Sequence, residues 1–182
     1  MRPLTANEVE VRIGTVGKKG VTMLLYKNAR VDRAMLDDEF GRMNWQCRYT
    51  EHKGNLFCSI GVYNPDTKEW VWKEDCGTES QTEKEKGEAS DAFKRAGFRW
   101  GIGIELYNSP KISIPVTTES NGKGGYMMSN KWELFGSFVS HMKVEDVDGI
   151  RKVTELDIAK TEFNGRTYII WSTDERKVGN VL

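Results

Sequence analysis

The sequence predicts an α+β protein whose core is a helix, a three-stranded antiparallel sheet and a second helix. An N-terminal helix and strand precede this core, and a C-terminal antiparallel meander follows it. Three observations predict the arrangement. Residues 45–76 alternate in hydrophobicity between short turns, which is typical of antiparallel strands. Residues 86–103 repeat small and aromatic side chains every three or four positions, which is typical of a helix. Alternation returns after residue 131, which indicates the meander.

The first predicted element is a short helix from Ala6 to about Ile13. Thr5 is placed to cap it, and Glu8 follows three residues later, as in a capping box. Residues 14–20 are rich in glycine and predict a loop, and residues 21–27 predict a strand.

Asn28 begins the next predicted helix, which covers the segment VDRAMLDDEF. Its helical spacing allows four side chains to face inward, namely Val31, Ala34, Met35 and Phe40. The period then shortens to two, and short turns at residues 53–55 and 64–66 indicate antiparallel neighbours. The three predicted strands are residues 45–52, 56–63 and 69–76.

The long helix of the core is predicted from about Thr82 to Trp100, and the glycines Gly101 and Gly103 end it. Its inward stripe consists of Ala89, Ala92, Phe93, Ala96 and Trp100. Three cations lie off this stripe, namely Lys94, Arg95 and Arg99. They either favour the negative end of the helix dipole, by about 0.3–1 kcal/mol each, or hold a phosphate chain. The residues by themselves leave both interpretations open.

The later part of the chain is predicted to be a loop followed by strands. Residues 116–130 are polar and rich in glycine, which indicates a flexible loop. Turns at Asp148-Gly149 and Asn164-Gly165 then divide the remainder into a three-stranded meander. We therefore expect a core over residues 1–115 and, beyond the loop, a meander over residues 131–182 that extends the same domain.

The composition excludes several classes of protein. The chain has 182 residues, of which 38% are hydrophobic, enough for a packed core. No stretch approaches the roughly 18 consecutive apolar residues of a membrane span, and the first residues lack the apolar centre of a secretory signal. We expect a protein without membrane contact, in the cytoplasm of a bacterium or of a phage-infected host.

Metal and cofactor sites are not expected. Cys47, Cys58 and Cys76 form no C-x-x-C pair, and the chain has only two histidines. Neither glycine-rich segment fits a nucleotide-binding loop, because GTVGKKG lacks the required spacing and GIGIEL has Leu106 where a third glycine is needed. No catalytic residue is predicted.

The charge distribution permits a nucleic-acid partner although the net charge is zero, with 27 basic and 27 acidic residues. Residues 1–30 hold six basic residues against two acidic ones. Phosphate binding requires a local basic strip where the strand lies, and a basic protein as a whole is not needed.

The order of helix, three strands and helix, together with EASDAFKRAGFRWGIG, resembles the single-strand annealing proteins of the Rad-fifty-two superfamily, especially the phage members called Sak. The resemblance covers about residues 5 to 108. The shared pattern is S-D-x-x-K-R-A followed by G-x-G, carried here by Ser90, Asp91, Lys94, Arg95, Ala96, Gly101 and Gly103.

This resemblance implies an ATP-independent protein of DNA recombination and repair that is not an enzyme. It would bind single-stranded DNA in a positively charged groove of a homo-oligomeric ring and anneal complementary strands. The candidate protein partner is a single-strand binding protein or an exonuclease. In the family, a lysine-arginine pair and an arginine of the N-terminal helix line the inner groove, and these correspond to Lys94, Arg95 and Arg12.

Two further family contacts are displaced in this sequence. The third basic position of the long helix is Phe98 here, with Arg99 one step beyond, which corresponds to a rotation of about 100° around a helix. The lysine of the outer DNA contact corresponds to Asn55, and Lys53 is the nearest substitute.

Two alternative functions remain open from the residues. A double-stranded RNA binding module also has the order helix, three strands, helix, and it would use early lysines of the second helix, here Lys84 and Lys86. Glu88 and Asp91 stand three apart on the same helix and could share a metal ion in a nuclease, although acidic residues there also suit the positive end of the helix.

Overall fold

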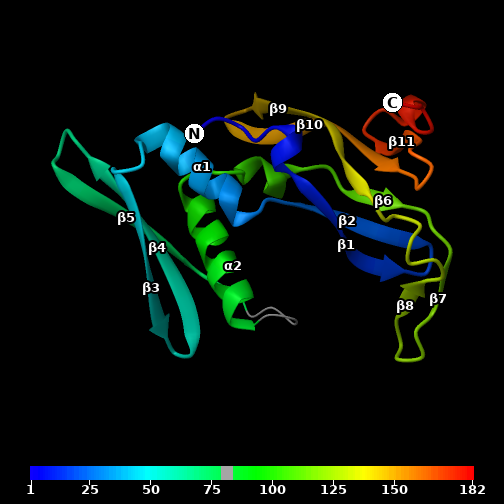
Figure 1. Cartoon of the computed structure of the whole chain (residues 1–182), viewed down its shortest axis with the longest axis horizontal. Coiled ribbons are helices and arrows are strands. Elements are labelled where there is room, and N and C mark those ends of the chain that lie inside the picture. The colour runs from blue at the N-terminus through cyan, green and yellow to red at the C-terminus, as the bar shows by residue number, and fades with distance from the viewer. Residues whose placement is uncertain (79–83) are drawn as a thin grey trace. The chain divides into compact units, whose positions relative to one another are not determined.

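The computed structural model describes residues 1–78 and 84–182, and for residues 84–86 it describes the backbone alone. The protein is α+β, with two α-helices and several antiparallel sheets in the described residues (Figure 1). The chain divides into two compact units. The first unit contains Met1–Pro3 and Lys27–Ile104, and the second contains Leu4–Tyr26 and Glu105–Leu182.

The first unit contains the predicted three-stranded sheet. One helix precedes the sheet along the chain and another follows it. The sheet is antiparallel in the order β3-β4-β5, in which β3 and β4 meet at a turn of two residues. The elements are α1 (Ala29–Phe40), β3 (Trp45–His52), β4 (Asn55–Asn64), β5 (Glu69–Cys76) and α2 (Lys84–Arg99). The prediction of a three-stranded antiparallel sheet is confirmed.

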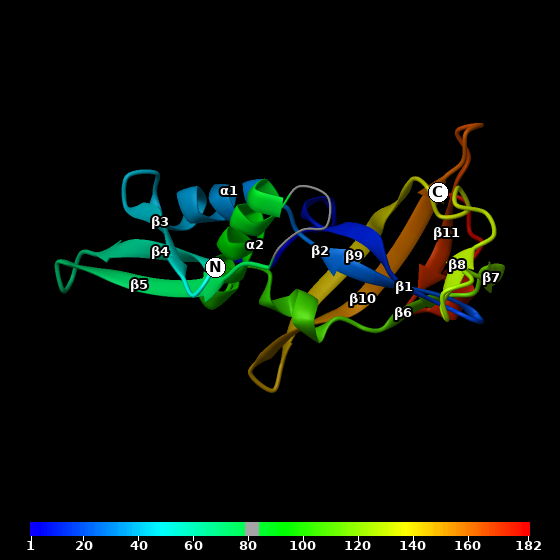
Figure 2. The ribbon, with the colours of Figure 1, turned by 90° about the horizontal axis from the view of Figure 1, so that it is seen from below.

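Both helices of the first unit pack on the same face of its sheet (Figures 1 and 2). Trp45 of β3 contacts both, because its Nε1 donates to Asp37 Oδ1 of α1 at 2.7 Å and its ring lies 6.2 Å from that of Phe93 of α2. Side chains at alternate positions of β4 are buried on this face, as expected for period two. The fully buried side chains of the interface are Cys58, Ile60, Ala92 and Ala96.

The inward face of α1 was predicted only in part. Asn28 caps the helix, because its Oδ1 accepts hydrogen bonds from the backbone nitrogens of Arg30 and Val31. Met35 is buried as predicted, but Ala34 is exposed and Leu36 is fully buried. The stripe is rotated toward Leu36 because α1 packs against α2 as well as against the sheet.

The end of α2 is a Schellman motif, as its glycine predicted. The nitrogen of Ile102 donates to the carbonyl of Gly97 and the nitrogen of Gly101 donates to that of Phe98. Gly101 has φ +84°, which a residue with a side chain adopts only with strain. The predicted start of this helix, at Thr82, lies outside the described residues.

The second unit consists of two three-stranded antiparallel sheets and a short hairpin. One sheet has the order β1-β2-β6 and the other β11-β10-β9, and they meet where β1 lies by β9 and β6 by β11. The strands are β1 (Glu10–Gly17), β2 (Gly20–Tyr26), β6 (Ile112–Ile114), β7 (Thr118–Ser120), β8 (Tyr126–Met128), β9 (Ser137–Val147), β10 (Ile150–Thr161) and β11 (Thr167–Ser172). The predicted meander is therefore confirmed.

The predicted N-terminal helix from Ala6 to about Ile13 is wrong beyond Glu8. The capping signal forms only the 3₁₀ turn η1 (Ala6–Glu8), in which Glu8 Oε2 accepts from the backbone nitrogen of Thr5. From Glu10 the chain pairs with β2 instead. A single helical turn is marginal without a packed face, whereas pairing with β2 gives the segment inter-strand hydrogen bonds from Glu10 to Gly17.

Residues 116–130, predicted as a flexible loop, contain the hairpin of β7 and β8, which pair from Thr118 with Met128 to Ser120 with Tyr126. Met128 is buried, so the segment contributes to the core of the second unit. No helix among the described residues is long and apolar enough to cross a membrane.

Candidate nucleic-acid interface

Two arginines of α2 share one carboxylate of β5. Arg99 Nε donates to Asp75 Oδ2 at 3.0 Å, and Arg95 Nε approaches Asp75 Oδ1 at 3.4 Å. Residues four apart on a helix lie on the same face, which is why both reach one acceptor. Their terminal guanidinium nitrogens make no hydrogen bond to any described residue, and the two side chains are 41% and 61% exposed.

Lys73 adds a third cation to this cluster. Its Nζ donates to the carbonyl of Arg99 at 3.0 Å and lies 4.3 Å from the centroid of the Trp100 ring. The carbonyls of the last helical turn have no partners within the helix, so Lys73 satisfies one of them. We call Lys73, Asp75, Arg95 and Arg99 the α2–β5 cluster. It contains three cations and one anion.

The electrostatics of Asp75 agree with this arrangement. Partial burial would raise the pKa of its carboxyl, but the hydrogen bonds from the Cys76 nitrogen and from Arg99, with the charge of Arg95, lower the pKa overall. Asp75 is therefore ionised at neutral pH and neutralises only part of the cationic charge around it.

Lys94 lies one residue before this pair and belongs to a different environment. The pKa of Asp32 responds to the Lys94 charge, and the Lys94 carbonyl accepts from Lys27 Nζ at 3.2 Å. Lys27 and Asp32 form an ion pair that is almost completely buried. Burial raises the pKa of Asp32 to about 6 against the opposing effect of Lys27.

Two residues of α2 fit closely around the buried pair. The Lys27 ammonium lies 4.2 Å from the centroid of the Phe98 ring, so Phe98 is an aromatic partner of Lys27. A Cβ at Gly97 would overlap Asp32 Oδ1. The pair thus positions the turn of α2 that carries the cations.

The other two predicted DNA contacts belong to other elements. Lys53 is exposed at the turn between β3 and β4, with φ +52°. Arg12 belongs to the second unit, on β1 and not on a helix, and its guanidinium lies 5.1 Å from the centroid of the Tyr26 ring. The structure therefore brings Arg95 and Arg99 together, and Lys94 is their neighbour along the helix.

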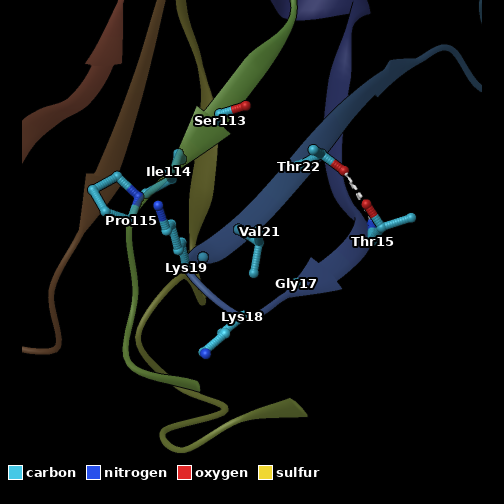
Figure 3. A pocket seen from close by; sticks show the side chains of 10 residues that line it. Thr15, Gly17, Lys18, Lys19, Val21, Thr22, Ser113, Ile114 and Pro115 are labelled. Carbon is cyan, nitrogen blue, oxygen red and sulfur yellow. Dashed lines mark hydrogen bonds between the residues drawn. The ribbon is translucent and has the colours of Figure 1, made fainter. Parts of the chain in front are cut away.

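The second unit carries further cations at the turn between β1 and β2. Lys18 and Lys19 line a pocket there together with residues 113–115, and Lys19 lies beside Ile114 and Pro115 (Figure 3). Thr15 and Thr22 also line the pocket, and their hydroxyls lie 2.6 Å apart. The loop predicted over residues 14–20 is therefore wrong in its first half, because residues 14–17 belong to β1 and only Lys18 and Lys19 form the turn to β2. These lysines account for part of the basic excess near the N-terminus.

Lys73, Asp75 and Gly97 were missed by sequence reasoning. Lys73 and Asp75 stand two apart on a strand and so share a face, but only the packing of α2 on β5 shows that this face meets the arginines. A glycine inside a helix costs about 1 kcal/mol of helix stability relative to alanine. Gly97 could therefore have been noticed as a position where close packing calls for a glycine.

The carboxylates considered for a nuclease have structural roles. Glu88 Oε1 accepts from the nitrogen of Leu56 at 3.0 Å, and Asp91 Oδ2 accepts from the nitrogen and hydroxyl of Thr78 at 3.1 and 2.9 Å. Among the described residues, no group of three or more His, Cys, Asp or Glu side chains could hold a metal ion. The side chains of Lys84 and Lys86 lie outside the described residues.

Comparison of the chain with protein-family models, with curated proteins and with solved structures finds no match.

Proposed function

We propose that this protein binds single-stranded DNA through the α2–β5 cluster and Lys94, and that it anneals complementary strands without ATP. The observation that carries the proposal is the pairing of Arg95 and Arg99 on the single carboxylate of Asp75. Each arginine uses only Nε for this contact. The terminal nitrogens are the part of a guanidinium that binds phosphate in a two-pronged manner.

The position of the cluster favours contact with a chain of phosphates. Arg95 and Arg99 are separated by about 6 Å along α2, at 1.5 Å per residue. Two cations at such a separation can contact successive groups of an extended polyanion. Lowering the repulsion between two polyanions is the physical requirement of annealing, and no bond has to be made or broken.

We further propose a homo-oligomeric ring in which sheets of neighbouring subunits join. In the described part of the first unit, β3 and β5 each pair with β4 alone, so each has an open edge. An open edge tends to pair with another strand, and head-to-tail joining of edges closes into a ring when the rotation permits.

The salt dependence of binding tests the DNA site. The Lys94→Ala/Arg95→Ala variant should lose affinity for a dT oligonucleotide, and the slope of log affinity against log salt should fall by roughly 0.7 for each lost phosphate contact. A matched control is Lys123→Ala/Lys131→Ala, which removes two exposed lysines of the second unit. An unchanged slope in a folded double variant would exclude Lys94 and Arg95 from the site.

Two further measurements separate the alternative functions. Negative-stain imaging with and without oligonucleotide should show closed rings, and a monomer under both conditions would contradict the ring. Duplex RNA should compete poorly with single-stranded DNA. Strong competition would favour a double-stranded RNA binding module instead.

A further inference from the structure

We propose that the face of the β3-β4-β5 sheet opposite the helices stacks unpaired bases of single-stranded DNA, with Trp70 as the stacking ring and Arg48 as the phosphate contact. This inference rests on the proposed function and adds a base-contacting surface to it. We call this surface the outer face. It includes Arg48, Gly61, Tyr63, Trp70, Trp72 and Glu74.

Strand alternation assigns these residues to one face. Cys58, Ile60 and Val62 of β4 are buried on the helix side, so Ser59, Gly61 and Tyr63 point the other way. Both helices of the first unit, α1 and α2, lie on the side of the sheet that carries these buried residues (Figure 2). The cross-strand partners of Gly61 and Tyr63 on β5 are Trp72 and Trp70, which therefore belong to the outer face as well.

Gly61 allows Trp72 to lie flat on the sheet. A Cβ at Gly61 would come within 2.8 Å of three atoms of the Trp72 ring. Real Cβ atoms do not approach other atoms so closely, so any other residue at this position would displace the indole. A glycine inside a strand usually weakens the strand. Gly61 is explained by the close approach of the Trp72 ring, which leaves no room for a side chain.

Arg48 is held above this ring. Its guanidinium carbon lies 4.2 Å from the centroid of Trp72, and Arg48 makes no ion pair with any residue that the structure describes. Arg48 thus differs from Arg95 and Arg99, which share Asp75. A guanidinium held against an aromatic ring keeps its hydrogen-bond donors at the edge of its plane, where they can bind phosphate.

Trp70 extends the row of rings next to Trp72. The two indole centroids are 6.2 Å apart, and Tyr63 lies 5.6 Å from Trp70 in an edge-on arrangement. Trp70 is 38% exposed, which leaves part of the ring accessible. Its neighbours hold it on two sides, so stacking of a base on Trp70 requires little further ordering.

The charge and ring chemistry together favour an oligonucleotide over a protein. An exposed cation one ring away from an exposed indole matches a nucleotide, in which a planar base is linked to an anionic phosphate. The carboxylate of this face, on Glu74, accepts from Ser59 Oγ at 3.0 Å and is not paired with Arg48. The alternative occupants are a second copy of the chain and an aromatic surface of another protein. Oligonucleotide affinity, measured together with oligomeric mass, distinguishes them from DNA.

The experiment compares two oligomers of equal length, a dT oligonucleotide and an abasic oligomer that has the phosphates without the bases. Fluorescence anisotropy is measured for wild type, Trp70→Ala, Trp70→Phe and Arg48→Ala. We expect Trp70→Ala to weaken dT binding about tenfold and to leave abasic binding unchanged. Trp70→Phe should retain most of the preference for dT, because the aromatic ring remains. Arg48→Ala should weaken binding to both oligomers.

The chain offers matched controls in the second unit. Trp132 is 60% exposed, so Trp132→Ala removes an exposed indole of the second unit. Arg166 lies 5.8 Å from the centroid of the Tyr168 ring, so Arg166→Ala removes a comparable cation over a ring. Both control variants should bind both oligomers as the wild type does.

Other results would overturn the inference. One is a Trp70→Ala variant that keeps the wild-type preference for dT over the abasic oligomer. Another is a change in oligomeric mass by light scattering with unchanged oligonucleotide affinity, which would make the outer face a subunit interface. Arg95→Ala/Arg99→Ala is measured in parallel. If this variant binds normally while Trp70→Ala and Arg48→Ala bind more weakly, the proposed α2–β5 site fails and the outer face stands. If wild type binds neither oligomer, both proposals fail.

Discussion

Arg99 donates from Nε to Asp75 across the interface between α2 and β5, at 3.0 Å. The Arg99 side chain is 61% exposed and that of Asp75 is 17% exposed. Ion pairs with one exposed partner contribute only about 0–1 kcal/mol to stability. The contact therefore orients the arginine more than it stabilises the fold, and its effect on ligand binding can be measured separately from folding.

Removal of the shared carboxylate should strengthen DNA binding. In Asp75→Asn, Arg95 and Arg99 lose their common anion, and the local positive charge rises by one. We expect a higher affinity for a dT oligonucleotide and a steeper dependence on salt, measured by anisotropy over a salt series. Glu145→Gln, which removes an exposed carboxylate of the second unit, serves as the control. Weaker binding by Asp75→Asn would show that Asp75 is needed to orient the arginines.

Gly97→Ala should destabilise the protein, although alanine is the better helix former. Helix propensity alone predicts a gain of roughly 0.5–1 kcal/mol for this change. The added methyl would overlap Asp32 Oδ1, and overpacking costs about 1–3 kcal/mol. Urea unfolding measures the sign. In a Lys27→Met/Asp32→Ala background, the same substitution should cost less, and an equal cost would show that the carboxylate is not the obstacle.

The buried pair of Lys27 and Asp32 should show strong coupling. Either Lys27→Met or Asp32→Ala leaves an uncompensated buried charge, which costs about 3–5 kcal/mol. The double variant removes both charges and should be less destabilised than the sum of the single variants. A double-mutant cycle by denaturant unfolding measures this difference. Additive effects would contradict the coupling.

The same pair predicts a particular pH dependence. The pKa of Asp32 is raised to about 6 in the folded protein, chiefly by burial. The folded state therefore binds more protons than the unfolded state between the ordinary carboxyl pKa and about 6. The stability contributed by this protonation is fully present below the ordinary pKa and is lost as pH rises through about 6.

The measurement compares wild type with Lys27→Met/Asp32→Ala across this range. The free energy of unfolding of wild type, taken relative to the double variant, should fall as pH rises from about 4 to about 6. Other carboxylates titrate in both proteins and cancel in the difference. A difference that is constant or rises with pH would show that the pKa of Asp32 is not raised.

Much of the first unit could be predicted from the sequence because its signals are local. The turns at residues 53–55 and 64–66 set the three strands, and Asn28 and Gly101 set helix ends through their own hydrogen bonds or backbone conformation. Three residues of the predicted stripe of α2 are buried, namely Ala92, Phe93 and Ala96, as their spacing predicts, whereas Ala89 and Trp100 are only half-buried. The candidate arginines could also be identified, because cations near a helix end are visible in the sequence.

The strand that follows η1 and the acidic partner of the two arginines could not be predicted from the sequence, because both depend on tertiary contacts. The capping signal at Thr5 and Glu8 is satisfied by a single turn, and the strand that follows forms because β2 is available to pair with it. Arg12 consequently lies on a strand. Arg95 and Arg99 meet on Asp75 because α2 packs on β5. Gly97 accommodates Asp32 because α2 also packs against α1. Local periodicity determines which side of an element is apolar, but contacts between residues distant in sequence determine what its polar side chains meet.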